Sequence, residues 1–200
     1  MDNFKYLGTI VNKMNNRSVE VNARLTMANR AYYGLQNHMK SRNISRNTKP
    51  LLYKTPIRPV LTYGAETWVI SKQDEHRLST FERKILQRIY GPVKDGGKWR
   101  IRTNQEIYQE CGENDIVKFC KLSSLRWAGH VIRQDDDDPS RRVLVSEPGG
   151  KHPRGRPRLR WEDGEEEDVA RPGCRNWKVA ALNREGWRKL LKEAKAHPGL

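Results

Sequence analysis

A short basic segment near the C-terminus has residue types suited to contacting DNA or RNA. Residues 151–160 hold five basic side chains and no acidic one. Prolines keep such a segment extended, and Gly155 lets the backbone approach a surface closely. Arg154 and Arg156 can then enter the narrow, electronegative minor groove of A·T-rich DNA, while Arg158 and Arg160 extend the same charge. The alternative is a solvated basic linker, and we favour generic phosphate contact over groove recognition.

Two runs of carboxylates raise the question of a metal-dependent nuclease. They are Asp135–Asp138 and Glu165–Asp168. Two-metal catalysis needs carboxylates from separate elements that converge around ions about 4 Å apart, whereas four consecutive aspartates splay in different directions. We therefore interpret the first run as a solvated acidic loop and the second as acids that favour a helix N-terminus. No residue is predicted to be catalytic, and no cofactor is expected.

The cysteines and histidines do not have the spacing of a metal site. Cys111, Cys120 and His130 are separated by eight and nine residues, and no CxxC pair occurs, so partly buried thiols and a packed imidazole are the favoured interpretation. The sequence also lacks a Ser/His/Asp signature, a P-loop and a dinucleotide fingerprint. Together with Cys174, these cysteines form a sparse, odd-numbered set that we interpret as reduced thiols in an intracellular protein.

The charge of the chain favours a polyanionic partner. Its 39 Lys and Arg against 24 Asp and Glu give a net charge of +15 and a pI of about 10. Residues 1–100 carry 19 basic and 7 acidic side chains, so most of the excess lies in the first half. A positive surface of this size most often binds DNA or RNA. No apolar run approaches the length of a membrane span, so no membrane partner is expected.

Two predicted helices position further basic side chains. The first spans residues 17–41, where apolar residues are spaced alternately four and three apart, and Arg17 and Arg24 share a different face. The second spans residues 72–90, between a capping box begun by Ser71 and the terminating pair Gly91-Pro92. On it three cations fall within about 40° of one another, at 100° per residue. They are Arg77, Lys84 and Arg88, and both faces are candidates for tracking a phosphate backbone.

The other elements follow from shorter signals. Residues 4–11 predict a strand or half of a hairpin, and Pro56 and Pro59 predict a kink or break in a helical stretch over 48–70. Residues 91–98 are expected to be a glycine-rich linker and a domain boundary. Further helices are expected at 103–110, where Thr103 and Glu106 have the spacing of a capping box, and at 115–133, 139–145, 163–170 and 183–196. Five of the six tryptophans lie from position 99 onward and are attributed to packing rather than to base stacking; they are Trp99, Trp127, Trp161, Trp177 and Trp187.

The ordered set of motifs resembles the C-terminal portion of non-LTR retrotransposon (LINE-type) endonuclease–reverse transcriptases. The resemblance covers nearly the whole chain, and the set is specific although each motif is weak. In order, the motifs are Phe4-Lys5-Tyr6-Leu7-Gly8, Leu52-Tyr53, Pro59-Val60-Leu61-Thr62-Tyr63-Gly64-Ala65-Glu66-Thr67-Trp68, Leu125-Arg126-Trp127-Ala128-Gly129-His130, Arg154-Gly155-Arg156-Pro157 with Arg160-Trp161, and Asn183-Arg184 with Trp187-Arg188.

The resemblance implies a different role for each segment of the chain. Phe4 to Gly8 would be the primer grip, which assigns primer contacts to Tyr6, Leu7 and Gly8. Residues 17–91 would be the thumb, which clamps the template–primer duplex, and residues 99–200 would help to hold template RNA and target DNA. The catalytic aspartates of such polymerases lie in the palm, upstream of the primer grip, so we expect none of them in this chain.

We therefore expect a mainly α protein with an N-terminal β-hairpin remnant, a helical thumb-like bundle, and a second small helical region with an extended basic arm. The expected parts are 1–16, 17–91, 92–146, 147–162 and 163–200. The expected function is RNA and DNA binding, as template–primer duplex or target DNA, without catalysis, in the nucleus or a cytoplasmic ribonucleoprotein. A reverse transcriptase palm in trans is a further candidate partner.

Two other interpretations of the chain stay open. One is a stand-alone basic DNA-binding protein, because the Pro153–Pro157 core resembles an AT-hook. The other is a chain with little stable fold, since a thumb normally packs against a palm.

Overall fold

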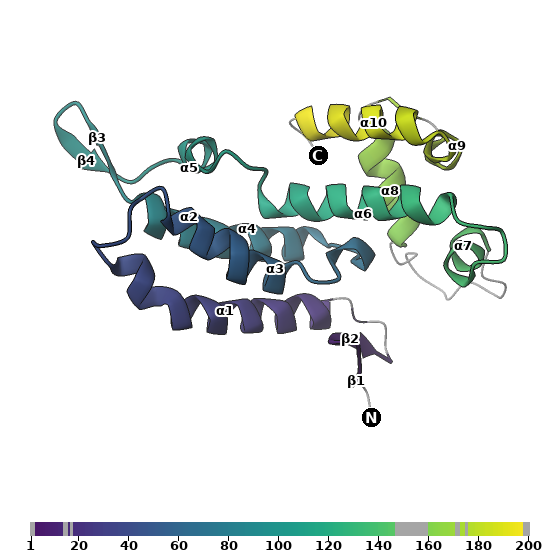
Figure 1. Ribbon diagram of the computed structural model, residues 1–200, viewed down its shortest axis with the longest axis horizontal. Helices are drawn as coiled ribbons and strands as arrows, with labels where there is room; N and C mark the ends of the chain where they lie inside the picture. Colours follow the sequence, from purple (N-terminus) through teal and green to yellow (C-terminus); the bar gives the residue numbers. More distant parts are fainter. Residues whose placement is uncertain are drawn as a thin grey trace. The chain divides into compact units, whose positions relative to one another are not determined.

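The computed structural model describes residues 3–13, 16, 18–146, 160–170, 173–174 and 176–197. It is mainly helical with an N-terminal hairpin, which confirms the predicted fold class (Figure 1). The chain forms two compact units: unit 1 comprises Met1–Gly64 and Ile70–Val117, and unit 2 comprises Ala65–Val69 and Lys118–Leu200. The boundary after Val117 therefore lies inside a helix and not in the glycine-rich stretch where we expected it.

The N-terminal segment of unit 1 is a complete β-hairpin. Strand β1 (Asn3–Tyr6) pairs antiparallel with β2 (Thr9–Asn12). The two turn residues, Leu7 and Gly8, have φ values of 46° and 87°. A two-residue hairpin turn of the kind that matches the twist of its strands needs positive φ at both positions. Gly8 accepts this conformation freely, whereas Leu7 adopts it at some cost in strain.

Three helical segments form the core of unit 1. The predicted first helix is confirmed as α1 (Ser18–Lys40). It packs against α4 (Lys72–Tyr90) and against a segment made of α2 (Lys49–Leu52), η1 (Tyr53–Ile57) and α3 (Arg58–Leu61). The apolar stripes predicted from spacing point inward, and they supply most of the buried side chains. Those are Val21, Ala28, Tyr32, Met39, Tyr53, Ile57, Leu61, Leu78, Phe81, Ile85, Leu86 and Ile89.

The expected break near Pro56 is replaced by a π-helical turn, so the chain stays helical from Lys49 to Leu61. Pro56 lies inside η1, where the wider turn tolerates a residue that lacks an N–H and crowds the preceding carbonyl. Pro59 follows directly at the start of α3, next to the widened turn, and the helix continues through it.

The predicted ends of α4 are confirmed, but the stretch that follows is not a linker. Ser71 and Asp74 form the capping box, and Gly91 closes the helix with a φ of 64°. Strands β3 (Val93–Asp95) and β4 (Lys98–Arg100) then form a second antiparallel hairpin. It leads into α5 (Asn104–Cys111), whose predicted capping box of Thr103 and Glu106 is also present.

Unit 2 is a small helical domain built mostly around one long helix, α6 (Ile116–Ile132), whose first two residues belong to unit 1. Its other elements are η2 (Ala65–Thr67), α7 (Pro139–Val145), α8 (Trp161–Ala170), α9 (Trp177–Leu182) and α10 (Arg184–Ala196). The sequence predicted all of these α-helices except α9. The core consists of Leu125, Ala128, Ile132, Val169, Trp177, Ala181 and Trp187. Among the described residues, no helix is long and apolar enough to cross a membrane.

Candidate nucleic-acid interface

The apex of the first hairpin presents apolar side chains on a fixed backbone. Tyr6 and Leu7 are 61% and 76% exposed. The Leu7 carbonyl accepts a hydrogen bond from the Tyr63 hydroxyl at 2.8 Å, and the Gly8 carbonyl accepts one from Arg24 at 2.6 Å. Both carbonyls of the turn are therefore anchored by unit 1, while Tyr6 and Leu7 stay available to a partner. Two separate motifs of the chain, Phe4–Gly8 and Pro59–Trp68, meet at this turn.

Arg24 itself is not available to a phosphate, which corrects our prediction for this side chain. It is 6% exposed, and its guanidinium lies 2.6 Å from the Glu20 carboxylate and 4.5 Å from the centre of the Tyr63 ring. Glu20 in turn accepts a hydrogen bond from the Ile10 amide at 2.6 Å. The ion pair thus joins α1 to the hairpin. Arg17, its predicted companion, lies outside the described residues.

The second predicted set of cations lies exposed along α4. Arg77, Lys84 and Arg88 are all on the solvent side of the helix. Arg77 donates a hydrogen bond of 2.6 Å to the Asn22 side chain of α1, whereas Lys84 and Arg88 have no hydrogen bond or ion pair within the part of the chain that the structure describes. A row of cations that the protein does not neutralise is suited to the regularly spaced phosphates of a duplex.

Helix α1 extends this surface with a stripe that the sequence interpretation missed. The Asn22–Arg77 hydrogen bond connects the exposed face of α4 to an exposed stripe of α1 that contains Arg30 and the 58% exposed Tyr33. The full stripe is Asn22, Thr26, Arg30, Tyr33 and Asn37, and it contains no acidic residue. Its spacing of four, four, three and four was visible in the sequence, so helical periodicity could have found it.

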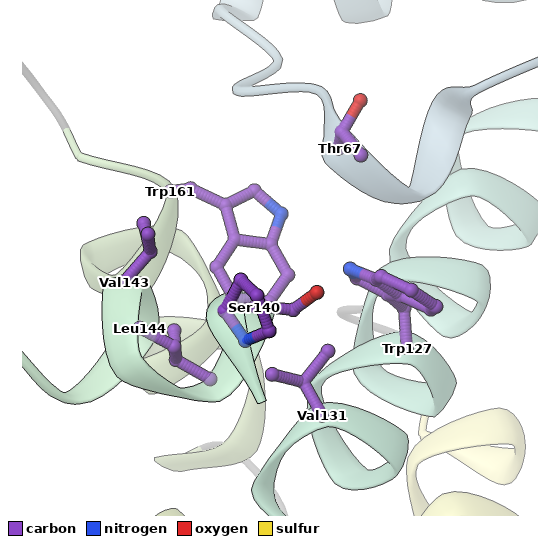
Figure 2. A pocket seen from close by; sticks show the side chains of 8 residues that line it. Thr67, Trp127, Val131, Ser140, Val143, Leu144 and Trp161 are labelled. Atoms are coloured by element: carbon purple, nitrogen blue, oxygen red, sulfur yellow. The ribbon is translucent and has the colours of Figure 1, made fainter. Parts of the chain in front are cut away.

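Unit 2 contains an apolar pocket of about 440 Å³ (Figure 2). Trp127 of α6 and Trp161 of α8 line it, together with valine and leucine side chains of α6 and α7 and no ionisable group. The Trp161 indole N–H donates to the Ser124 hydroxyl at 2.8 Å and to the Glu66 carbonyl at 3.0 Å, which fixes the ring. The pocket is suited to an apolar or flat aromatic group and offers nothing to neutralise a charge.

The second acidic run is partly buried, and our interpretation of it as helix-N-terminal acids is wrong. Helix α8 begins at Trp161, so Glu165 and Asp168 lie in its middle and last turns, where both are buried. Glu165 accepts a hydrogen bond from Ser124, and its burial raises the pKa of the carboxyl to about 8. Asp168 pairs with Lys121 at 3.1 Å. These contacts assign the two acids to packing of α8 on α6.

Two aspartates of the first acidic run have structural partners, and the three thiols are buried or half-buried. Asp138 caps α7 by accepting from the Ser140 amide, and Asp136 pairs with Arg141 at 2.8 Å. Cys111 and Cys120 are buried and Cys174 half-buried, and none of the three forms a disulfide. The described residues contain no group of three or more His, Cys, Asp or Glu side chains able to hold a metal ion.

The basic arm can be placed only at its last residue. Arg154, Arg156 and Arg158 lie outside the described residues. Arg160 is exposed, and its backbone amide donates to the Asp163 carboxylate at 2.7 Å, ahead of the first turn of α8. The contacts that we predicted for the arm therefore stay predictions.

Comparison with known proteins places the chain near a transposon product. Over 198 residues, which is 96% of the chain, it is 25% identical to a Caenorhabditis elegans protein described as transposon-derived and uncharacterised, and the match covers 71% of that protein. No protein-family model matches the chain, and no solved structure does. The similarity is consistent with a transposon origin for this chain.

Proposed function

We propose that this chain is the template- and primer-holding portion of a non-LTR retrotransposon reverse transcriptase, and that it binds RNA and DNA without a catalytic residue of its own. Three facts support the proposal. The ordered motifs resemble that region, the relative in Caenorhabditis elegans is transposon-derived, and the fold is mainly helical. A stand-alone DNA-binding function through the arm is the alternative, and no contact of a described residue favours it.

The observation that carries the proposal is the cationic row of α4 (Arg77, Lys84 and Arg88). Seven residues of α-helix rise about 10 Å and four rise about 6 Å, so the row is extended along the helix axis rather than clustered. Charge spread along an axis matches a polyanion whose phosphates repeat along its own axis. Contacts of this kind fix the position of a duplex without selecting a base sequence.

Under this proposal the first hairpin contacts the primer end of the duplex. Its turn is anchored through two carbonyls, and Tyr6 and Leu7 are exposed. We expect exposed side chains on such a fixed backbone to contact the sugar and base at the end of a primer. In this arrangement Arg24 is a positioning residue, because it holds the turn through Gly8 and does not contact the nucleic acid.

The test is a charge-matched comparison of two triple variants. The first is Arg77→Gln/Lys84→Gln/Arg88→Gln on α4. The control is Lys189→Gln/Lys192→Gln/Lys195→Gln, which removes the same charge from the exposed side of α10 in unit 2. Binding of each protein to a labelled RNA–DNA hybrid duplex is measured by fluorescence anisotropy over a range of salt concentrations.

The α4 triple variant is expected to flatten the dependence of log K on log salt by about 0.9 for each lost phosphate contact. The control is expected to keep the wild-type slope. Equal slopes for both variants would mean that only net charge matters and would overturn the proposal. A strong preference for A·T-rich DNA that disappears with Arg154→Ala/Arg156→Ala would favour the alternative function.

A further inference from the structure

Trp99 differs from the buried tryptophans in its exposure. We attributed the five tryptophans from position 99 onward to packing, and Trp177 and Trp187 are indeed 4% and 2% exposed. Trp99, on β4, is 68% exposed. An indole is the largest apolar side chain, so leaving two thirds of its surface in water is unfavourable unless a partner covers it.

The two faces of this second hairpin are chemically different. Side chains alternate across a strand, and Lys94 of β3 is the cross-strand partner of Trp99 on the same face. On the opposite face Arg100 lies 2.8 Å from Asp95 and forms a two-pronged contact with Glu106, at 2.9 and 2.7 Å. Because Glu106 belongs to the capping box of α5, this contact fixes the hairpin to the helix. One face of the hairpin is thus attached to α5, and the face that carries Trp99 is accessible to a partner.

We infer that the Trp99 face of the β3–β4 hairpin binds an unpaired base of single-stranded nucleic acid. Trp99 supplies a flat surface on which a base of any identity can stack, and Lys94 supplies a positive charge for the adjoining phosphate. Ile101, 75% exposed two residues after Trp99, extends the apolar surface. The inference rests on the proposed function and adds to it: the duplex is held along α4, and an unpaired strand is held at the hairpin.

The local charge favours nucleic acid over a protein partner. The acidic side chains around the hairpin form ion pairs with arginines. Arg100 pairs with Asp95 and Glu106, and Arg102 pairs with Glu110 at 3.2 Å. Lys94, on the same face as Trp99, is exposed and has no hydrogen bond or ion pair with another described residue. An exposed aromatic ring beside an uncompensated cation is the combination found where proteins bind single strands.

The experiment uses the full chain with Trp99→Ala, Trp99→Phe and Lys94→Gln, and with Lys192→Gln as a charge-matched control from α10. Each protein is titrated with a labelled oligothymidylate and, separately, with a labelled blunt duplex. Thermal unfolding by circular dichroism and sedimentation velocity are measured in parallel. An exposed side chain can be replaced with little change in stability, so all variants should unfold close to the wild-type temperature.

Trp99→Ala is expected to weaken binding of the oligothymidylate by about tenfold or more and to leave duplex binding unchanged. Trp99→Phe should retain most of the affinity, and Lys94→Gln should reduce the salt dependence where Lys192→Gln does not. Unchanged oligothymidylate binding by Trp99→Ala, with wild-type binding intact, would overturn this inference only. Loss of self-association in that variant would identify a protein contact and also overturn it. A wild-type chain that binds neither probe would overturn the proposed function as well.

Discussion

The indole of Trp187 lies against the backbone of Gly129, so closely that a Cβ at Gly129 would come within 2.2 Å of the indole nitrogen. That nitrogen donates a hydrogen bond of 3.2 Å to the Leu125 carbonyl, one turn earlier in α6. The motifs Leu125–His130 and Asn183–Arg188, far apart in the sequence, are therefore two halves of one packing contact inside unit 2. Their resemblance to retrotransposon motifs reflects the core, and by itself it says nothing about ligand contact.

Gly129→Ala is expected to destabilise unit 2 by about 2 kcal/mol or more, because the added methyl group must displace a buried indole. Gly164→Ala in α8 is the matched control, since its methyl group would meet no atom within 4 Å. The control should leave stability unchanged or raise it by about 0.5–1 kcal/mol through helix propensity. Urea unfolding followed by tryptophan fluorescence measures both, and equal midpoints would contradict the contact.

Glu165 should make the stability of unit 2 depend on pH. Burial raises its pKa from 4.5 to about 8, so between these values the folded state keeps a proton that the unfolded state releases. Stability should therefore fall as the pH rises from about 4.5 to about 8, by roughly 1.4 kcal/mol for each unit over which the proton difference persists. Glu165→Gln keeps the neutral form and should flatten the profile.

The neighbouring exposed acid supplies the control for this titration. Glu166→Gln should retain the wild-type dependence of the melting temperature on pH. If Glu165→Gln and the wild type show the same dependence across this range, the buried carboxyl does not control it.

Glu82 should be the most sensitive polar position of unit 1. Its carboxylate accepts from the Tyr53 hydroxyl at 2.6 Å, the Tyr108 hydroxyl at 3.1 Å and the Ile116 amide at 2.7 Å. Glu82→Ala leaves these buried donors without their acceptor, and we expect a loss of about 3 kcal/mol. Glu110→Ala, which removes an exposed ion pair with Arg102, should cost less than about 1 kcal/mol. Chemical denaturation compares the two, and similar losses would refute the assignment.

Arg24→Ala should release the first hairpin from α1 while α1 stays folded. The substitution removes the donor to the Gly8 carbonyl and leaves Glu20 buried without its guanidinium partner. Amide hydrogen exchange should accelerate throughout β1 and β2, including at Ile10, and change little in α4. Arg24→Lys, which keeps the charge and loses the fork of donors, should give an intermediate rate. Unchanged exchange at Ile10 would show that the strands hold themselves in place.

Local signals in the sequence predicted the local structure well. The capping boxes at Ser71 and Thr103, the glycine stop at Gly91 and the apolar stripe of α1 are all present, because each depends on residues within a few positions of one another. The basic row of α4 was found for the same reason, since helical periodicity alone sets it.

What the sequence did not reveal depends on contacts between distant residues. Arg24 looked like a solvent-facing cation because nothing local shows that the hairpin turn and Tyr63 enclose it. Glu165 was assigned to a helix N-terminus because nothing local shows its contact with Ser124, which is 41 positions away. The β3–β4 hairpin was mistaken for a linker because its strands have three residues each, too few for an alternating pattern to be recognised.

The π-helical turn η1 makes this stretch of chain tolerant to the loss of a residue and intolerant to the gain of one. In this turn the Arg58 amide donates a hydrogen bond to the Tyr53 carbonyl, so two residues five positions apart lie on the same interior side of the helix. On that side the Tyr53 hydroxyl donates a hydrogen bond to Glu82, and Arg58 forms an ion pair with Glu113. Losing one residue between them would restore an ordinary helical turn, in which residues four positions apart also share a face, so Tyr53 and Arg58 would both keep their interior side. Adding one residue has no such remedy: it would rotate everything downstream by about 100° about the axis and separate the arginine from its carboxylate although neither residue had been replaced.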